Sequence, residues 1–211
     1  MNRLLKRVLL VIVLLLVCVS IYYKFLTHSY TRLFYDKIKI DNTFTKSVSN
    51  LYLPDSKNGM EFTYMFWINV PNIPENSNVL NTSYEYDKFI LSRYNSPGFF
   101  YNIKKNKLNI NLQYKINEVL KKFILTIDGN KLKQQRWTHI VLVLNNRDVS
   151  IYLNGTLHKS SLIPSVPFLF KKNIIIGQKN NNFNGTLFDG RYYNKALSEE
   201  KINSIYEQGG V

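Results

Sequence analysis

The sequence predicts an all-β fold, an antiparallel β-sandwich with one short C-terminal helix, preceded by an N-terminal transmembrane helix. Three observations support this prediction. About ten segments rich in β-branched and aromatic residues recur at short intervals bounded by turn residues. Residues 137–160 combine three of these segments with two tight turns. A single apolar run of helical length covers residues 8–23.

The apolar run is expected to be an uncleaved signal anchor. Sixteen residues of helix span about 24 Å, less than the roughly 30 Å hydrocarbon core, and the basic residues on both sides can snorkel to the interface. A cleaved signal peptide is the alternative, but large apolar side chains crowd its best cleavage site, residues 18–20. We therefore expect a short basic cytoplasmic tail over residues 1–7 and an extracytoplasmic or luminal C-terminal domain.

The first part after the anchor, residues 24–59, is expected to form a polar and aromatic stalk with a first edge strand at residues 34–40. Residues 61–70 form the next strand, because aromatic and β-branched side chains fill both of its faces. Further strands are expected at residues 88–93, 99–103, 107–113 and 123–127, whereas residues 115–122 remain ambiguous.

The strongest local signal is the meander over residues 137–160. Its first strand, residues 137–144, is apolar on both faces and therefore belongs in the middle of a sheet. The dipeptide Asn154-Gly155 predicts a type I′ hairpin turn, which sets Leu153 opposite Thr156. Two more strands follow, and Ser198 then caps a helix that begins with two glutamates and stops at Gly209.

The order of these pieces resembles a known family. The matching segments are FTYMFWINV at 62–70, RWTHIVLVL at 136–144, VSIYLNGTL at 149–157, IIIGQ at 174–178 and FNGTLFDGRYYNKALSEEKI at 183–202. They resemble the laminin-G-like, or concanavalin A-like lectin/glucanase, jelly roll in its pentraxin-type form. The resemblance implies a two-sheet sandwich over residues 60–211 and, commonly, binding of glycans or proteins. Membrane-anchored, Lys/Asn-rich chains of this kind also look similar to membrane proteins of large DNA viruses.

No catalytic residues are expected. Glycoside hydrolases with this fold carry their two carboxylates on one strand in a Glu-x-Asp-x-x-Glu pattern, which is missing here. Glu61 stands alone, and the glutamates at the helix start are explained by the helix dipole. His139 lies on the central strand and is expected to be structural. The chain's one cysteine, Cys18, lies in the apolar run and forms neither a Cys/His pair nor an intramolecular disulfide.

A metal or other cofactor is not expected. Calcium is frequent in the superfamily that the chain resembles, and it needs several convergent oxygen ligands. The aspartates Asp128, Asp148 and Asp189 are scattered along the sequence, and turn chemistry explains the first two without a metal. Calcium binding is the alternative that the sequence leaves open.

The formal net charge of +14 points to an anionic partner. Anionic glycans, nucleic acid and acidic lipid are the candidate partners, and of these nucleic acid should lie across a membrane from the domain. A sulfated or sialylated glycan would fit a basic face, but the sequence favours a solvated face produced by a composition rich in Lys and Asn. The proposed basic face comprises Lys104, Lys105, Lys107, Lys121, Lys122 and Arg136.

Three Asn-x-Ser/Thr sequons begin at Asn81, Asn154 and Asn184. The last two precede glycine and serve as turn residues, so Asn81 in the long loop is the best acceptor.

Taken together, these features predict a membrane-anchored, non-catalytic recognition or adhesion module that binds carbohydrate or protein on an opposing surface. A structural envelope or virion membrane protein without a glycan ligand is the alternative, and a glycoside hydrolase is the third hypothesis. The sequence does not indicate an oligomeric state.

Overall fold

The computed structural model describes residues 10–19, 30–56, 60–72 and 87–209. The chain divides into two compact units, residues 1–30 and 31–211. In the first unit, residues 10–19 form a helix with exposed side chains. No helix in the described ranges is both long and apolar enough to cross a membrane. The rest of the expected anchor, residues 8–9 and 20–23, and the basic tail lie outside the described residues, so the transmembrane anchor stays a prediction.

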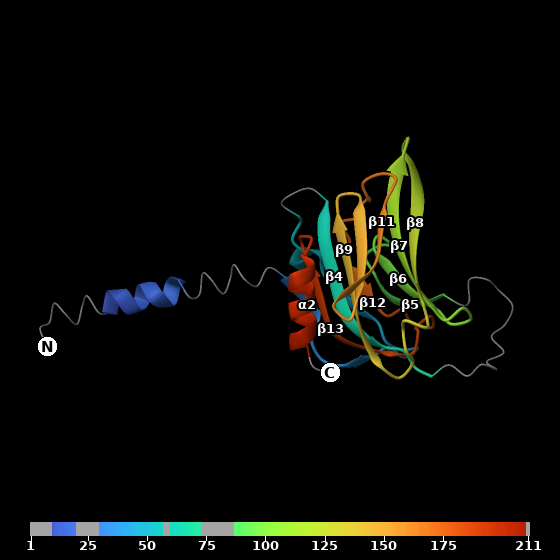
Figure 1. The fold of residues 1–211 in the computed structure, drawn as a ribbon, viewed down its shortest axis with the longest axis horizontal. Helices are drawn as coiled ribbons and strands as arrows, with labels where there is room; N and C mark the ends of the chain where they lie inside the picture. The colour runs from blue at the N-terminus through green and yellow to red at the C-terminus, as the bar shows by residue number, and fades with distance from the viewer. Residues whose placement is uncertain (1–9, 20–29, 57–59, 73–86, 210–211) are drawn as a thin grey trace, which may run out of the picture. The chain divides into compact units, whose positions relative to one another are not determined.

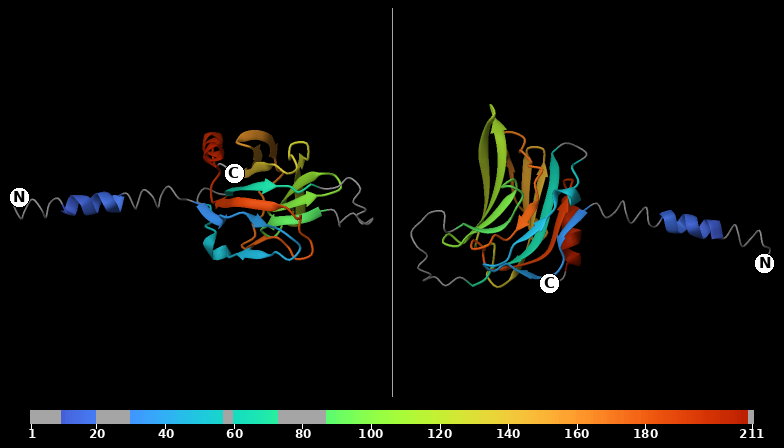
Figure 2. Two further views of the ribbon diagram at one scale, coloured as in Figure 1. Left: turned by 90° about the horizontal axis from the view of Figure 1, so that it is seen from below. Right: turned by 180° about the vertical axis from the view of Figure 1, so that it is seen from behind.

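The second unit is a sandwich of two antiparallel sheets (Figures 1 and 2). Sheet A has the order β1 (Tyr30–Phe34), β13 (Thr186–Tyr193), β4 (Glu61–Asn69), β9 (Trp137–Asn145), β10 (Asp148–Leu153) and β11 (Thr156–Leu162), with β2 (Ile38–Lys39) also paired to β13. Sheet B has the order β3 (Lys46–Val48), β12 (Ile174–Ile176), β5 (Asp87–Ser92), β6 (Gly98–Asn102), β7 (Lys107–Ile116) and β8 (Val119–Asp128). The predicted fold class is confirmed for the sandwich.

Strand β4 lies at the centre of sheet A, as its composition predicts. Phe62, Tyr64, Phe66 and Ile68 point into the core between the sheets and are at most 1% exposed. The alternate residues Met65 and Trp67 are also buried, but on the outer face of the sheet. Both faces of β4 therefore exclude water, because the other sheet covers one and the C-terminal helix covers the other.

The meander β9–β10–β11 has the predicted register. Leu153 pairs with Thr156 and Tyr152 with Leu157. Asn154 and Gly155 have φ values of 49° and 80°, the positive values that a type I′ turn requires. Seven of the nine residues of β9 are buried, which confirms its place inside the sheet.

The N-terminal boundary of the sandwich differs from the prediction. Residues 30–56, which the sequence assigned to a stalk with one edge strand, contribute β1, β2, β3 and the 3₁₀ helix η1 (Asn50–Tyr52). Leu33, Phe34 and Ile40 are buried in the core. The sandwich therefore begins near residue 30. The predicted edge strand at residues 34–40 contains β2, whereas β3 and most of β1 were missed, because strands of three and five residues are too short to show a period.

The ambiguous residues 115–122 form the outer end of the β7–β8 hairpin. Asn117 and Glu118 make its turn, with φ values of 49° and 62°. Strand β6 pairs with β7 only as far as Asn111, so the hairpin extends past its neighbour. Figures 1 and 2 show the hairpin projecting from the end of the sandwich.

Helix α2 (Glu199–Gln208) confirms the predicted C-terminal helix. The Ser198 hydroxyl caps it by accepting a hydrogen bond from the backbone N–H of Lys201 at 3.4 Å. Ile202 and Ile205 are buried, and the Tyr206 ring stacks on Trp67 with centroids 5.6 Å apart. The helix thus closes the outer face of sheet A. The strands that the structure describes, and the core between the two sheets, lie within residues 30–193, and α2 follows them.

Candidate functional site

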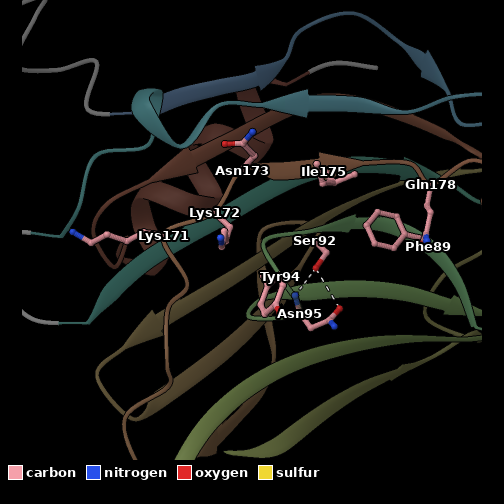
Figure 3. Close-up of a pocket in the computed structure, with 9 residues that line it drawn as sticks. All are labelled: Phe89, Ser92, Tyr94, Asn95, Lys171, Lys172, Asn173, Ile175 and Gln178. Atoms are coloured by element: carbon pink, nitrogen blue, oxygen red, sulfur yellow. Dashed lines mark hydrogen bonds between the residues drawn. The ribbon is translucent and has the colours of Figure 1, made fainter.

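An open pocket of about 630 Å³ lies on the outer face of sheet B (Figure 3). Its side chains come from β5, the β5–β6 turn, β12 and the segment that leads into β12. The lining residues are Phe89, Ser92, Tyr94, Asn95, Lys171, Lys172, Asn173, Ile175 and Gln178. The floor follows from strand alternation. Ile174 and Ile176 enter the core, so Ile175 between them faces outward.

One wall of the pocket is the turn that joins β5 to β6. The Ser92 hydroxyl accepts a hydrogen bond from the backbone N–H of Asn95 at 2.7 Å, which fixes the turn. Tyr94 and Asn95 both have positive φ, 51° and 61°. This conformation turns the Tyr94 ring away from the core, and the residue is 59% exposed. The wall therefore offers an aromatic face next to an amide (Figure 3).

The opposite wall, residues 171–173, is held from inside by Arg93. This side chain is fully buried, and its Nε donates to the Lys172 carbonyl at 3.2 Å. Its Nη2 donates to the Asn50 side-chain oxygen. Asn173 is fixed as well, because its Oδ1 accepts from the Asn50 backbone N–H at 2.9 Å. These contacts keep Lys171 and Lys172 at the pocket rim.

Aromatic rings continue from the pocket toward the β7–β8 hairpin. The Tyr94 and Phe170 ring centroids are 4.5 Å apart, and those of Phe170 and Phe168 are 4.7 Å apart. The Lys115 ammonium lies 5.2 Å from the centre of the Phe168 ring. We call Tyr94, Phe170 and Phe168 the aromatic ladder. Next to the pocket, it provides flat apolar surface beside hydrogen-bonding amides and cationic amines.

Comparison with known proteins identifies the fold family. The sequence pattern of the concanavalin A-like lectin/glucanases superfamily matches residues 45–203, about three quarters of the chain. The chain belongs to this superfamily. The predicted laminin-G-like resemblance is thereby confirmed for the domain. Membrane anchoring and a viral setting stay predictions.

The concanavalin A-like domain is also similar to parts of a mosquitocidal protein and of a botulinum neurotoxin. Paraclostridial mosquitocidal protein 1 of Paraclostridium bifermentans is 23% identical over 159 residues, which cover 69% of this chain and 12% of the relative. The binding domain of that protein matches 86% of this chain and 46% of its own, with a TM-score of 0.61 and 16% identity. The receptor binding domain of botulinum neurotoxin D matches 82% of this chain and 44% of its own, with a TM-score of 0.60 and 21% identity. The chain spans less than half the length of these relatives.

The basic residues predicted from the sequence do not gather at one place in this concanavalin A-like domain. Lys104 and Lys105 lie in the turn between β6 and β7, and Lys107 is the first residue of β7. Arg136 lies in the connection from β8 to β9. Lys122 pairs with Gln113, six residues along β7 from Lys107, so it lies about 20 Å away. Lys121 and Lys122 occupy opposite faces of β8, since they are consecutive. Ligand binding by these residues stays a prediction.

A second hollow, of about 470 Å³, contains Lys105 and Lys107. Its polar groups bond mainly to one another. Lys107 forms an ion pair with Asp128 at 2.9 Å, and this contact lowers the pKa of Asp128. Asn102 donates to the Asp87 carboxylate at 2.7 Å.

The sequons that the structure describes are structural turn positions. The Asn154 side-chain oxygen accepts from the backbone N–H of His139 at 2.9 Å. Asn184 has a φ of 59° and precedes Gly185, where a Cβ would collide with the Phe183 ring. Asn81 lies outside the described residues. Glycosylation at all three positions stays a prediction.

His139 is buried beneath α2, in agreement with the structural role predicted for it. Burial lowers its pKa from 6.5 to about 4. Asp189 binds Arg191 through both carboxylate oxygens, and Asp128 binds Lys107. Within the described ranges, no three His, Cys, Asp or Glu side chains gather as metal ligands would. Sequence reasoning missed the pocket beside Tyr94, because loops far apart in the sequence build it.

Proposed function

We propose that the chain is a non-catalytic recognition module, anchored to a membrane by residues 8–23, that binds an anionic glycan in the pocket beside Tyr94. One observation carries the proposal, namely the make-up of the pocket. It combines the exposed Tyr94 ring with the amides of Asn95, Asn173 and Gln178 and with two lysines. Sugars present apolar C–H faces to aromatic rings and hydroxyls to amides.

The two lysines point to an acidic sugar. Lys171 pairs with Asp55 at 2.8 Å, but the two side chains are 72% and 58% exposed. An ion pair so open to solvent contributes little to stability, so a sulfate or carboxylate can replace Asp55 as the partner of Lys171 at small cost. The backbone of Lys172 is already fixed by Arg93. The ligand would therefore meet a largely preformed site, which lowers the entropic cost of binding.

The relatives support recognition rather than catalysis. The solved structures named above are the binding domain of a mosquitocidal protein and the receptor binding domain of a botulinum neurotoxin. At identities of 21% and 16%, these structures show a shared fold alone. The argument for a glycan comes from the chemistry of the pocket. A role as a structural envelope component remains the alternative, in which the sandwich contacts other proteins and binds no glycan.

A glycan array probed with residues 30–211 tests the proposal, since these residues contain the core that the structure describes. We expect binding to sulfated or sialylated glycans that weakens as salt is added. The pair of substitutions Lys171→Glu and Lys172→Glu should abolish it. The matched pair Lys104→Glu and Lys105→Glu, in the turn between β6 and β7, should leave it in place. If only the variant with Lys104→Glu and Lys105→Glu loses binding, the glycan binds at the basic residues predicted from the sequence and not in the pocket beside Tyr94. No binding to any glycan would favour the envelope alternative.

A further inference from the structure

The β7–β8 hairpin ends in apolar side chains that no part of the described sandwich covers. Val119 is 58% exposed and Leu120 47% exposed, and Ile116 beside them is half-buried. Large apolar residues at the end of a projecting hairpin do not serve the core, since the core lies between the sheets. We call residues 113–122 the hairpin tip.

Basic residues follow the apolar ones along the same hairpin. Ile116 pairs with Val119 next to the turn, and Lys115 pairs with Leu120 one step behind. Lys121 and Lys122 come two and three residues after Val119, which places them about 7–10 Å from Val119 and about 3–7 Å from Leu120 along the strand. All three lysines are exposed. The hairpin tip thus has an apolar end and a basic collar.

The one acidic residue of the hairpin tip is already neutralised in part. Glu118 lies in the turn, and its carboxylate contacts the Lys115 ammonium at 3.1 Å. The remaining lysines, Lys121 and Lys122, have no acid opposite them, because they pair with Tyr114 and Gln113. The collar is therefore net positive.

We propose that the hairpin tip is a membrane contact, in which Val119 and Leu120 enter the boundary between headgroups and acyl chains of a bilayer rich in anionic phospholipid. Lys121 and Lys122 then meet the headgroup phosphates. The separation of the two groups suits this arrangement, because interfacial segments bury their apolar residues about 5–10 Å deep and keep their cations at the surface. The charge of the collar selects anionic lipid over neutral lipid. This contact is separate from the glycan pocket and does not depend on it.

Labelling one position at a time tests the contact in the full chain. Cys18 is the only cysteine, so Cys18→Ser leaves a background in which Leu120→Cys carries a single nitrobenzoxadiazole dye. The control, Asn130→Cys, labels an exposed turn at the other end of β8. The probes are vesicles of equal parts phosphatidylcholine and phosphatidylserine, and vesicles of phosphatidylcholine alone. We expect the dye at 120 to shift to shorter wavelength only with phosphatidylserine, while the dye at 130 does not shift.

Charge variants give the second readout. Lys121→Glu combined with Lys122→Glu should weaken the phosphatidylserine response about tenfold or more. Glu118→Gln should strengthen the response, because it removes the carboxylate that pairs with Lys115. No shift at 120, an equal shift at 130, or an equal response to phosphatidylcholine would overturn the proposal. A shift without vesicles would instead show that the tip binds a second copy of the chain, and would overturn it too.

Discussion

His139 on β9 and Trp67 on β4 occupy facing positions of sheet A, and their ring centroids lie 5.0 Å apart. Tyr206 of α2 covers both rings, at 6.0 Å from His139 and 5.6 Å from Trp67. The imidazole Nδ1 has no hydrogen-bond partner among the residues described. The helix is thus held to the sheet by a stack that favours a neutral imidazole, because burial penalises the charged form of the ring.

The stability of the domain should therefore depend on pH through His139. Burial lowers the pKa of His139 to about 4, with Arg191 adding to the effect and Asp189 opposing it. The unfolded imidazole titrates near 6.5. The neutral ring's contribution is fully present above pH 6.5 and is lost as the pH falls toward 4, because only the unfolded chain takes up the proton. We expect a loss of about 3 kcal/mol over this interval, measured by urea unfolding.

The control for this prediction is His139→Gln, which removes the titrating ring. Other ionisable groups act in both proteins, so the difference between the two pH profiles isolates His139. Between pH 4 and 6.5, the unfolding free energy of His139→Gln should change less steeply with pH than that of the wild type. Identical slopes would show that His139 does not carry the effect.

Substitution of Gly155 should destabilise the meander. Its φ is 80°, and a Cβ there would lie 2.6 Å from the Asn203 side-chain oxygen and 3.0 Å from the Tyr206 ring. We expect Gly155→Ala to lower the free energy of unfolding by about 1–3 kcal/mol, through backbone strain and crowding against α2. Thermal unfolding of the wild type and the variant measures this loss of stability. Asn154→Gly keeps the positive φ and loses only the bond to His139, so it should cost about 1 kcal/mol. If Asn154→Gly lowers the free energy of unfolding more than Gly155→Ala does, strain and crowding at Gly155 are not the main effect.

Loss of the Arg93 side chain should lower both the stability of the domain and its affinity for glycan. Arg93→Met keeps most of the buried apolar volume but removes the hydrogen bonds to Lys172 and Asn50. We expect the unfolding free energy to fall by about 2–3 kcal/mol, since these bonds involve a charged donor, and glycan affinity to fall with it. A control outside the pocket is Arg147→Met, because the exposed Arg147 donates a hydrogen bond from its Nε to the Ile163 carbonyl at 2.8 Å. Unchanged stability in Arg93→Met would show that apolar packing replaces the buried charge without loss.

The sequence predicted the elements whose signals are local. Strand β4 and the meander have continuous β-branched and aromatic residues, and Asn154-Gly155 sets the turn geometry by itself. Ser198 and Gly209 likewise mark the ends of α2. Strands β1 to β3 were not predicted individually, because each is too short for periodicity and depends on pairing with β13 or β12.

The candidate site could not be predicted from local patterns. Tyr94 and Lys172 lie far apart in the sequence and meet because β12 pairs with β5, with Ile175 opposite Ser92. A basic composition is visible in the sequence, but the distribution of lysines depends on strand register. Register places Lys107 and Lys122 about 20 Å apart on one hairpin.

The binding affinity of Tyr94→Ala for the best glycan on the array tests the central claim most directly. Tyr94 is exposed at the pocket wall, so its loss should leave the fold intact and remove the aromatic face. We expect affinity to fall about tenfold or more, as for other exposed aromatic anchors. Tyr52→Ala is the matched control, because Tyr52 is 70% exposed and does not line the pocket. Unchanged affinity in Tyr94→Ala, or an equal loss in Tyr52→Ala, would contradict binding in this pocket.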